Sequence, residues 1–142
     1  MKTKVLLVDE DASVHAALSS GLRREGCDVI NAFDTDEAMV CLQTHPGIDL
    51  VLLGLCVPVE SGWRILERLH WSRPLLPVII LTALPDQEAA AQAAGVGALL
   101  EKPLDIPVLL HTMRKLLAEP LEDGLARTAG QPPLRHQSIS LC

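Results

Sequence analysis

Aromatic side chains are scarce in this sequence, which has one Phe, two Trp and no Tyr among its 142 residues. A hydrophobic core must therefore be built from aliphatic side chains, and hydrophobic residues make up 49% of the chain. Charged residues account for 21%, a share typical of a folded globular protein rather than a disordered one. A chain of this length is expected to form one domain with a single core.

Long hydrophobic runs and clusters of basic residues are also lacking. No apolar run approaches the roughly 18 residues that a membrane-spanning helix needs, and the N-terminal stretch MKTKVLLVDED turns acidic too early for a secretory signal. We therefore expect a cytoplasmic protein that does not contact membranes. The formal net charge of −6 and the lack of a Lys/Arg cluster argue against sequence-independent binding of nucleic acid.

Cysteine motifs that bind metals are missing as well. The four cysteines form no C-x-x-C pair and have no histidine at metal-ligand spacing, and they are Cys27, Cys41, Cys56 and Cys142. We expect buried free thiols at these positions, rather than zinc ligands or disulfides.

Short apolar runs with strand character alternate with segments of helical periodicity along the first 118 residues. The strand-like runs cover residues 5–8, 29–30, 50–53, 78–81 and 98–100, and the helical segments cover 12–25, 34–44, 61–70, 85–95 and 105–118. Five such alternations predict an α/β fold in which βα units wind one parallel sheet covered on both faces. Residues 119–142 contain Pro120, Pro132 and Pro133 and show no sustained period, so we expect a flexible tail or linker there.

The ends of the predicted strands carry the polar side chains of greatest interest. In an open parallel sheet, ligands bind outside the carboxyl ends of the strands. The residues predicted to meet on this rim are Asp9, Glu10 and Asp11 after the first strand, Gly54 at the end of the third, Thr82 at the end of the fourth and Lys102 after the fifth. Simpler interpretations exist for each. The three acids cap a helix or interact favourably with its N-terminus, Thr82 favours a strand, Lys102 is solvated and Gly54 permits close backbone approach.

Four sequence blocks at these strand ends, VDED, LVLLGLCVPVESG, ILTA and EKP, resemble the receiver domain of bacterial two-component response regulators. The resemblance covers about residues 3–118 and implies a flavodoxin-like, doubly wound (βα)5 fold with a five-stranded parallel sheet. It implies that Asp9 and Glu10 help to hold Mg²⁺, and that Thr82 and Lys102 contact phosphoryl oxygens. It also implies a cis peptide bond before Pro103.

The sequence departs from the receiver pattern at two positions. Gly54 stands where receivers carry the aspartate that accepts phosphate from a histidine kinase, and glycine offers neither a nucleophile nor a metal ligand. Leu99 stands where many receivers carry an aromatic residue that reports phosphorylation. We interpret the chain as a degenerate receiver that is not an enzyme and binds Mg²⁺ only weakly. On this interpretation, Gly54→Asp is expected to restore part of the site.

A protein partner is the ligand that this interpretation implies. By resemblance, a histidine kinase or a downstream effector would bind the surface of the fourth helix, fifth strand and fifth helix, at residues 86–94, 98–101 and 105–118. Signalling would then proceed by protein contact without aspartyl phosphorylation.

Two alternatives remain open from the sequence. A phosphorelay receiver with an unusual acceptor could use Glu60 or Ser61 beyond Pro58, whereas Asp49 lies about 16 Å from the rim at the rise of a strand. A phosphatase of the haloacid-dehalogenase type could use the D-x-D of Asp9 and Asp11. It would need a second acidic pair, for which the only candidate is Glu122 and Asp123 in the tail.

Overall fold

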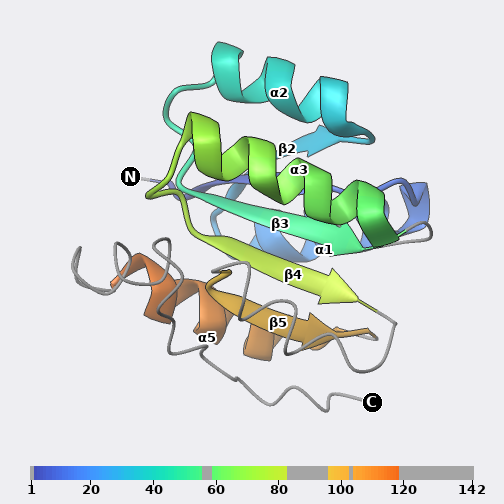
Figure 1. Cartoon of the computed structure of the whole chain (residues 1–142). Helices are drawn as coiled ribbons and strands as arrows, with labels where there is room; N and C mark the ends of the chain where they lie inside the picture. The colour runs from blue at the N-terminus through green and yellow to red at the C-terminus, as the bar shows by residue number, and fades with distance from the viewer. Residues whose placement is uncertain (1, 56–58, 83–95, 103, 119–142) are drawn as a thin grey trace.

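A single parallel sheet forms the centre of the molecule. The computed structural model describes residues 2–55, 59–82, 96–102 and 104–118 (Figure 1). The strands are β1 (Lys4–Val8), β2 (Asp28–Ala32), β3 (Leu50–Leu55), β4 (Val78–Thr82) and β5 (Ala98–Glu101). They form a five-stranded sheet in the order β2-β1-β3-β4-β5, and every neighbouring pair is parallel. The predicted doubly wound α/β fold of the flavodoxin-like type is confirmed.

Helices cover both faces of the sheet. The described helices are α1 (Ala12–Arg24), α2 (Thr35–Thr44), α3 (Val59–Ser72) and α5 (Ile106–Leu117). Helices α2 and α3 lie on one face, and α1 and α5 lie on the other (Figure 1). Within the described part of the chain, none of these helices is long and apolar enough to span a membrane.

The core consists of two aliphatic layers, one on each face of the sheet. Side chains alternate along each strand, so Leu6 and Val8 pack toward α2 and α3, whereas Val5 and Leu7 pack toward α1 and α5. Strand β3 divides in the same way between the two layers. Because both faces are covered, the central strands are apolar at nearly every position, as the sequence pattern indicated.

Several element boundaries differ from the predicted ones. Strand β3 extends to Leu55, so Gly54 lies inside the strand and not at its end. Helix α3 begins at Val59, which places Glu60 and Ser61 in its first turn and not in a loop. Asp34 and Asp105 are N-caps, with side chains that accept hydrogen bonds from the first turns of α2 and α5.

Several expectations lie outside the described residues. They are the helix at 85–95, the peptide bond before Pro103, Cys56, Cys142 and the tail at 119–142. Cys27 is buried, as expected, whereas Cys41 is only half-buried, and both are free thiols.

Candidate functional site

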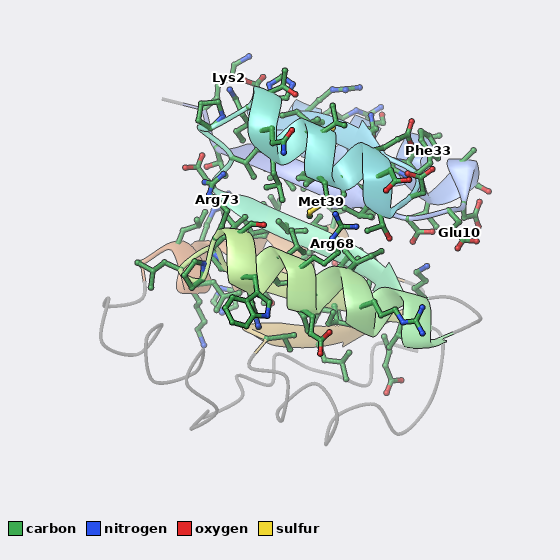
Figure 2. The ribbon with its side chains drawn as sticks, turned by 45° about the horizontal axis from the view of Figure 1, so that its top comes forward. Lys2, Glu10, Phe33, Met39, Arg68 and Arg73 are labelled. Atoms are coloured by element: carbon green, nitrogen blue, oxygen red, sulfur yellow. The ribbon has the colours of Figure 1, made fainter. Side chains whose placement is uncertain are left out.

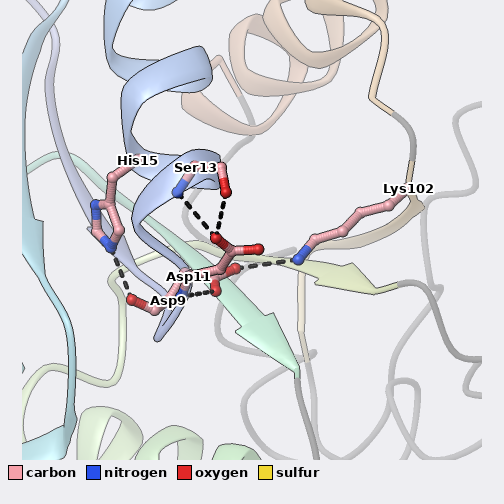
Figure 3. Close-up of polar contacts among 5 residues, drawn as sticks. All are labelled: Asp9, Asp11, Ser13, His15 and Lys102. Carbon is pink, nitrogen blue, oxygen red and sulfur yellow. Dashed lines mark hydrogen bonds and ion pairs between the residues drawn. The ribbon is translucent and has the colours of Figure 1, made fainter.

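Asp9 lies at the carboxyl end of β1 and is almost completely buried. Its side chain is 2% exposed, and its carboxylate has two different partners. Oδ1 accepts a hydrogen bond from the backbone N–H of Asp11 at 2.9 Å, and Oδ2 accepts one from Lys102 Nζ at 3.1 Å (Figure 3). A buried charge needs such partners because water cannot solvate it.

Gly54 lies directly beneath the carboxylate of Asp9. Val8 pairs with Leu53 in the β1–β3 register, so the next residues along both strands, Asp9 and Gly54, are neighbours. A Cβ atom built on Gly54 would lie 2.6 Å from Asp9 Cγ and closer still to Oδ2. The Asp9 carboxylate therefore occupies the space in which a side chain at position 54 would begin.

Lys102 and Thr82 lie on the other side of the rim. The backbone N–H of Lys102 donates to the carbonyl oxygen of Thr82 at 2.7 Å, which ties the end of β5 to the end of β4. Thr82 is fully buried, and the Lys102 side chain is 23% exposed. The predicted meeting of Asp9, Lys102 and Thr82 at one rim is thus observed.

Glu10 and Asp11 face solvent beside this buried pair. Glu10 is exposed and lies at the same end of the molecule as Phe33 (Figure 2). Asp11 is the N-cap of α1 and accepts hydrogen bonds from Ser13 Oγ at 2.6 Å and Ser13 N at 2.8 Å. These hydrogen bonds, the side-chain one first, lower the pKa of Asp11 from its ordinary value. Its expected capping role is therefore observed.

The family's Mg²⁺ site was tested against these side chains. Mg²⁺ requires near-octahedral oxygen ligation, usually including more than one carboxylate or phosphate group. Here both oxygens of Asp9 already accept hydrogen bonds, and Gly54 supplies no ligand. Among the described residues, no group of three or more His, Cys, Asp or Glu is placed to hold a metal ion. The residues as arranged do not fit the ion, and its affinity stays a prediction.

Leu99 has a packing role in this structure. Its side chain is buried in the layer under α2 and α3, together with Leu53 and Ile80. Residues 98–101 belong by resemblance to the expected partner surface, but the Leu99 side chain is 1% exposed and points into the core. The partner surface itself stays a prediction.

His15 is a buried polar residue that the sequence analysis did not single out. Its Nε2 donates to the carbonyl oxygen of Asp9 at 2.7 Å, and its Nδ1 lies 2.6 Å from Asn31 Oδ1. The ring of Phe33 covers it, with centroids 4.0 Å apart. The signal was available, because His15 precedes Leu18 and Leu22 by three and seven residues on the inward face of α1.

The sequence of this chain is similar to those of known response regulators. The family model of the response regulator receiver domain matches residues 5–114. The transcriptional regulatory protein ZraR of Salmonella typhimurium strain LT2 is 34% identical over 125 residues, covering 87% of this chain and 28% of ZraR. The DNA-binding transcriptional regulator NtrC of Rhizobium meliloti is 31% identical, covering 82% of this chain and 24% of NtrC.

Solved structures agree with this similarity. The signal receiver domain of an HD domain-containing protein from Pseudomonas fluorescens Pf-5 is 28% identical, with a TM-score of 0.74, and covers 82% of this chain and 95% of that one. The chain spans about a quarter of the length of ZraR and NtrC, so the similarity concerns only part of each of these proteins. Sequence, fold and the Asp9–Thr82–Lys102 rim together show that the chain belongs to the response regulator receiver domain family of two-component signalling.

Proposed function

We propose that this chain is a degenerate receiver, a signalling module that acts by protein contact without aspartyl phosphorylation. The observation that carries the proposal is Gly54, which lacks a side chain at the acceptor position and is covered by the carboxylate of Asp9. In this proposal the chain is cytoplasmic, has no catalytic activity of its own and needs no cofactor.

The geometry of Asp9 supports this proposal, because Asp9 is poorly placed to replace the missing acceptor. A carboxylate that accepts a phosphoryl group must present an oxygen in line with the incoming phosphorus. The Asp9 side chain is 2% exposed, and its two oxygens face the Asp11 N–H and the Lys102 ammonium. Attack by Asp9 would have to occur at a nearly buried carboxylate in which each oxygen already holds a hydrogen-bond donor.

The outer face of α5 is the described part of the proposed partner surface. It exposes His111, Arg114 and Lys115, and Leu117 at its end is 40% exposed. Three basic-type side chains beside an exposed leucine suit a partner that presents acidic groups around an apolar contact. A histidine kinase or a downstream effector is the class of partner that we propose for this face, with no role for nucleic acid or membrane.

Exposure to a small phosphodonor tests the proposal directly. The native chain would be incubated with acetyl phosphate and Mg²⁺, and its intact mass measured before and after acid treatment. We expect no acid-labile phosphoryl group and no stable uptake of beryllofluoride. An acid-labile adduct on the native chain would establish a phosphorelay receiver with an unusual acceptor and refute the proposal.

Partner capture tests the second half of the proposal. The amount of partner protein captured on the immobilised native chain should be the same with and without phosphodonor. It should be lower on the double variant Arg114→Glu/Lys115→Glu. The matched control is Arg64→Glu/Arg68→Glu, which makes the same charge change on exposed residues of α3. Capture that appears only with phosphodonor contradicts phosphate independence, and equal losses in both double variants contradict the assignment of the α5 face.

A further inference from the structure

We infer that Asp9 acts as a built-in replacement for the missing acceptor side chain, a positioning residue that holds Lys102 permanently over Gly54. In this chain the carboxylate that follows β1 takes the place of the carboxylate that other receivers carry on β3. This inference rests on the proposed function and identifies what keeps the unphosphorylated site in one state.

The glycine at position 54 is required by Asp9 and not by the backbone. Gly26 is the described glycine with a positive φ, whereas Gly54 lies within the regular pairing of β3 with β4. Any L-residue can adopt a strand conformation, so the backbone alone would accept a side chain at position 54. What prevents it is the Asp9 carboxyl carbon, 2.6 Å from the position of a Cβ atom.

The backbone of Asp9 is held on both sides. Its N–H donates to the carbonyl oxygen of Ala32 at 3.2 Å, and its own carbonyl oxygen accepts from His15 Nε2 at 2.7 Å. Because Asp11 N holds Oδ1 in addition, the carboxylate cannot swing away from Gly54 without losing a hydrogen bond. The position of Oδ2 beside Lys102 is therefore set by three neighbouring segments of the chain.

The ion pair joins strands that are far apart in the sequence. Lys102 follows β5, Asp9 follows β1, and the two residues are separated by 93 positions. Asp9 is nearly completely buried, so loss of Lys102 would leave a charge without its ionic partner. The pair therefore constrains the two sides of the rim in the same way in every molecule.

A fixed pair has a consequence for regulation. A ligand or modification shifts a conformational equilibrium only if it interacts differently with the two states. Phosphate on an acceptor would change the charge facing Lys102, whereas the Asp9 carboxylate is part of the chain and faces Lys102 whether or not phosphate is present. The expectation that Gly54→Asp restores part of the site stays a prediction, and the position of the Asp9 carboxylate means that Asp9 would have to move first.

A double-mutant cycle tests whether Asp9 replaces the missing acceptor side chain. The native chain is compared with Asp9→Ala, Gly54→Asp and the double variant carrying both changes, without phosphodonor or metal. Two properties are measured, namely the melting temperature and the NMR signal of the Lys102 side-chain ammonium group, which becomes visible when an ion pair slows its exchange with water.

Each single variant should be impaired, and the double variant should compensate for both changes. Asp9→Ala should weaken the Lys102 ammonium signal, and Gly54→Asp should lower the melting temperature by about 10 °C because two carboxylates are forced together. The double variant should recover most of that loss and regain the Lys102 signal, because the new carboxylate reaches the ammonium from β3. If Gly54→Asp does not fold, Gly54→Ala alone and with Asp9→Ala provides the same steric comparison.

Asp36→Ala is the control, since it removes an exposed acid in the first turn of α2 and should leave the Lys102 signal unchanged. Additive losses in the double variant, or a Lys102 signal as strong in Asp9→Ala as in the native chain, would overturn the inference. Neither result depends on phosphate uptake. The native chain could accept phosphate and refute the proposed function while the cycle still shows coupling, and the reverse outcome is equally recognisable.

Discussion

Charged side chains have different partners at the two ends of the sheet. At the amino ends of the strands, Arg73 Nη2 donates to the carbonyl oxygens of Ile48 at 3.1 Å and Pro46 at 3.3 Å, and Asp49 Oδ2 accepts from Lys4 N at 2.8 Å. Arg73 and Asp49 thus contact neutral backbone groups, and the ion pair at this end, between Lys2 and Asp28 at 3.8 Å, is exposed to solvent. At the carboxyl ends, Asp9 and Lys102 contact each other. Figure 2 shows Arg73 and Lys2 at one end and Glu10 and Phe33 at the other.

The difference lies in how strongly each residue depends on its partner. Removing Arg73 leaves neutral carbonyl groups, and water can reach those that are exposed. Removing Lys102 leaves a buried carboxylate, which is far more costly. The carboxyl end thus retains the coupled charges of a receiver site, although its acceptor position is a glycine.

The largest expected loss of stability comes from adding a methyl group at Gly54, and the same change at Gly97 is the comparison at the other end of the sheet. Gly54→Ala should lower the free energy of unfolding by about 3 kcal/mol, because the new Cβ displaces the Asp9 carboxylate from Lys102. Gly97→Ala, before β5, should cost only about 1 to 2 kcal/mol, since its Cβ meets flexible Leu116 methyl groups at 2.7 Å and 2.8 Å. Urea denaturation of both variants measures the difference. Equal losses would show that Asp9 moves aside freely.

Arg73→Ala is the next largest expected effect and probes the amino end. Two hydrogen bonds from a guanidinium group to backbone carbonyls are lost, one of them part-buried, so we expect a loss of about 2 kcal/mol. Arg68→Ala on the exposed side of α3 is the control and should stay within about 0.5 kcal/mol of the native chain. A loss for Arg73→Ala no greater than that of the control would show that these hydrogen bonds are replaced by water.

The sequence predicted the sheet and its rim because both depend on local patterns. Continuous apolar runs identified β1, β3 and β4, and the strand-end rule brought Asp9, Thr82 and Lys102 together. Strand β2 was predicted too short, because edge residues such as Asp28 and Asn31 are exposed and polar. The position of the Asp9 carboxylate could not be predicted. It depends on the β1–β3 register and on Lys102, 93 residues away.

Asp11→Ala should have a smaller effect that depends on pH. The hydrogen bonds from Ser13 lower the pKa of Asp11 below its ordinary value of 3.8. A lowered pKa means that the ionised carboxylate stabilises the folded state at pH values above 3.8, and that this contribution disappears as the pH falls through the lowered pKa. The native chain should therefore melt at a higher temperature than Asp11→Ala at pH 7, and the gap should close in strong acid. A gap that stays constant down to strong acid would show that the ionised cap contributes nothing.

The smallest effect concerns a buried group that avoids charge altogether. Cys27, which precedes β2 at the amino end, is 8% exposed, and burial is the main cause that raises the pKa of its thiol, although Arg114 opposes the shift. Asp9 has Lys102 as an ionic partner, whereas Cys27 can remain neutral without one. Iodoacetamide should therefore modify Cys27 much more slowly than it modifies the same cysteine in urea-unfolded chain at pH 7, with the rate rising only in alkaline solution. Peptide mass mapping after timed alkylation would follow this residue separately from the others. Modification at the unfolded rate at pH 7 would show that the amino end opens readily, and would remove the contrast between the neutral Cys27 thiol and the ion pair at the carboxyl end.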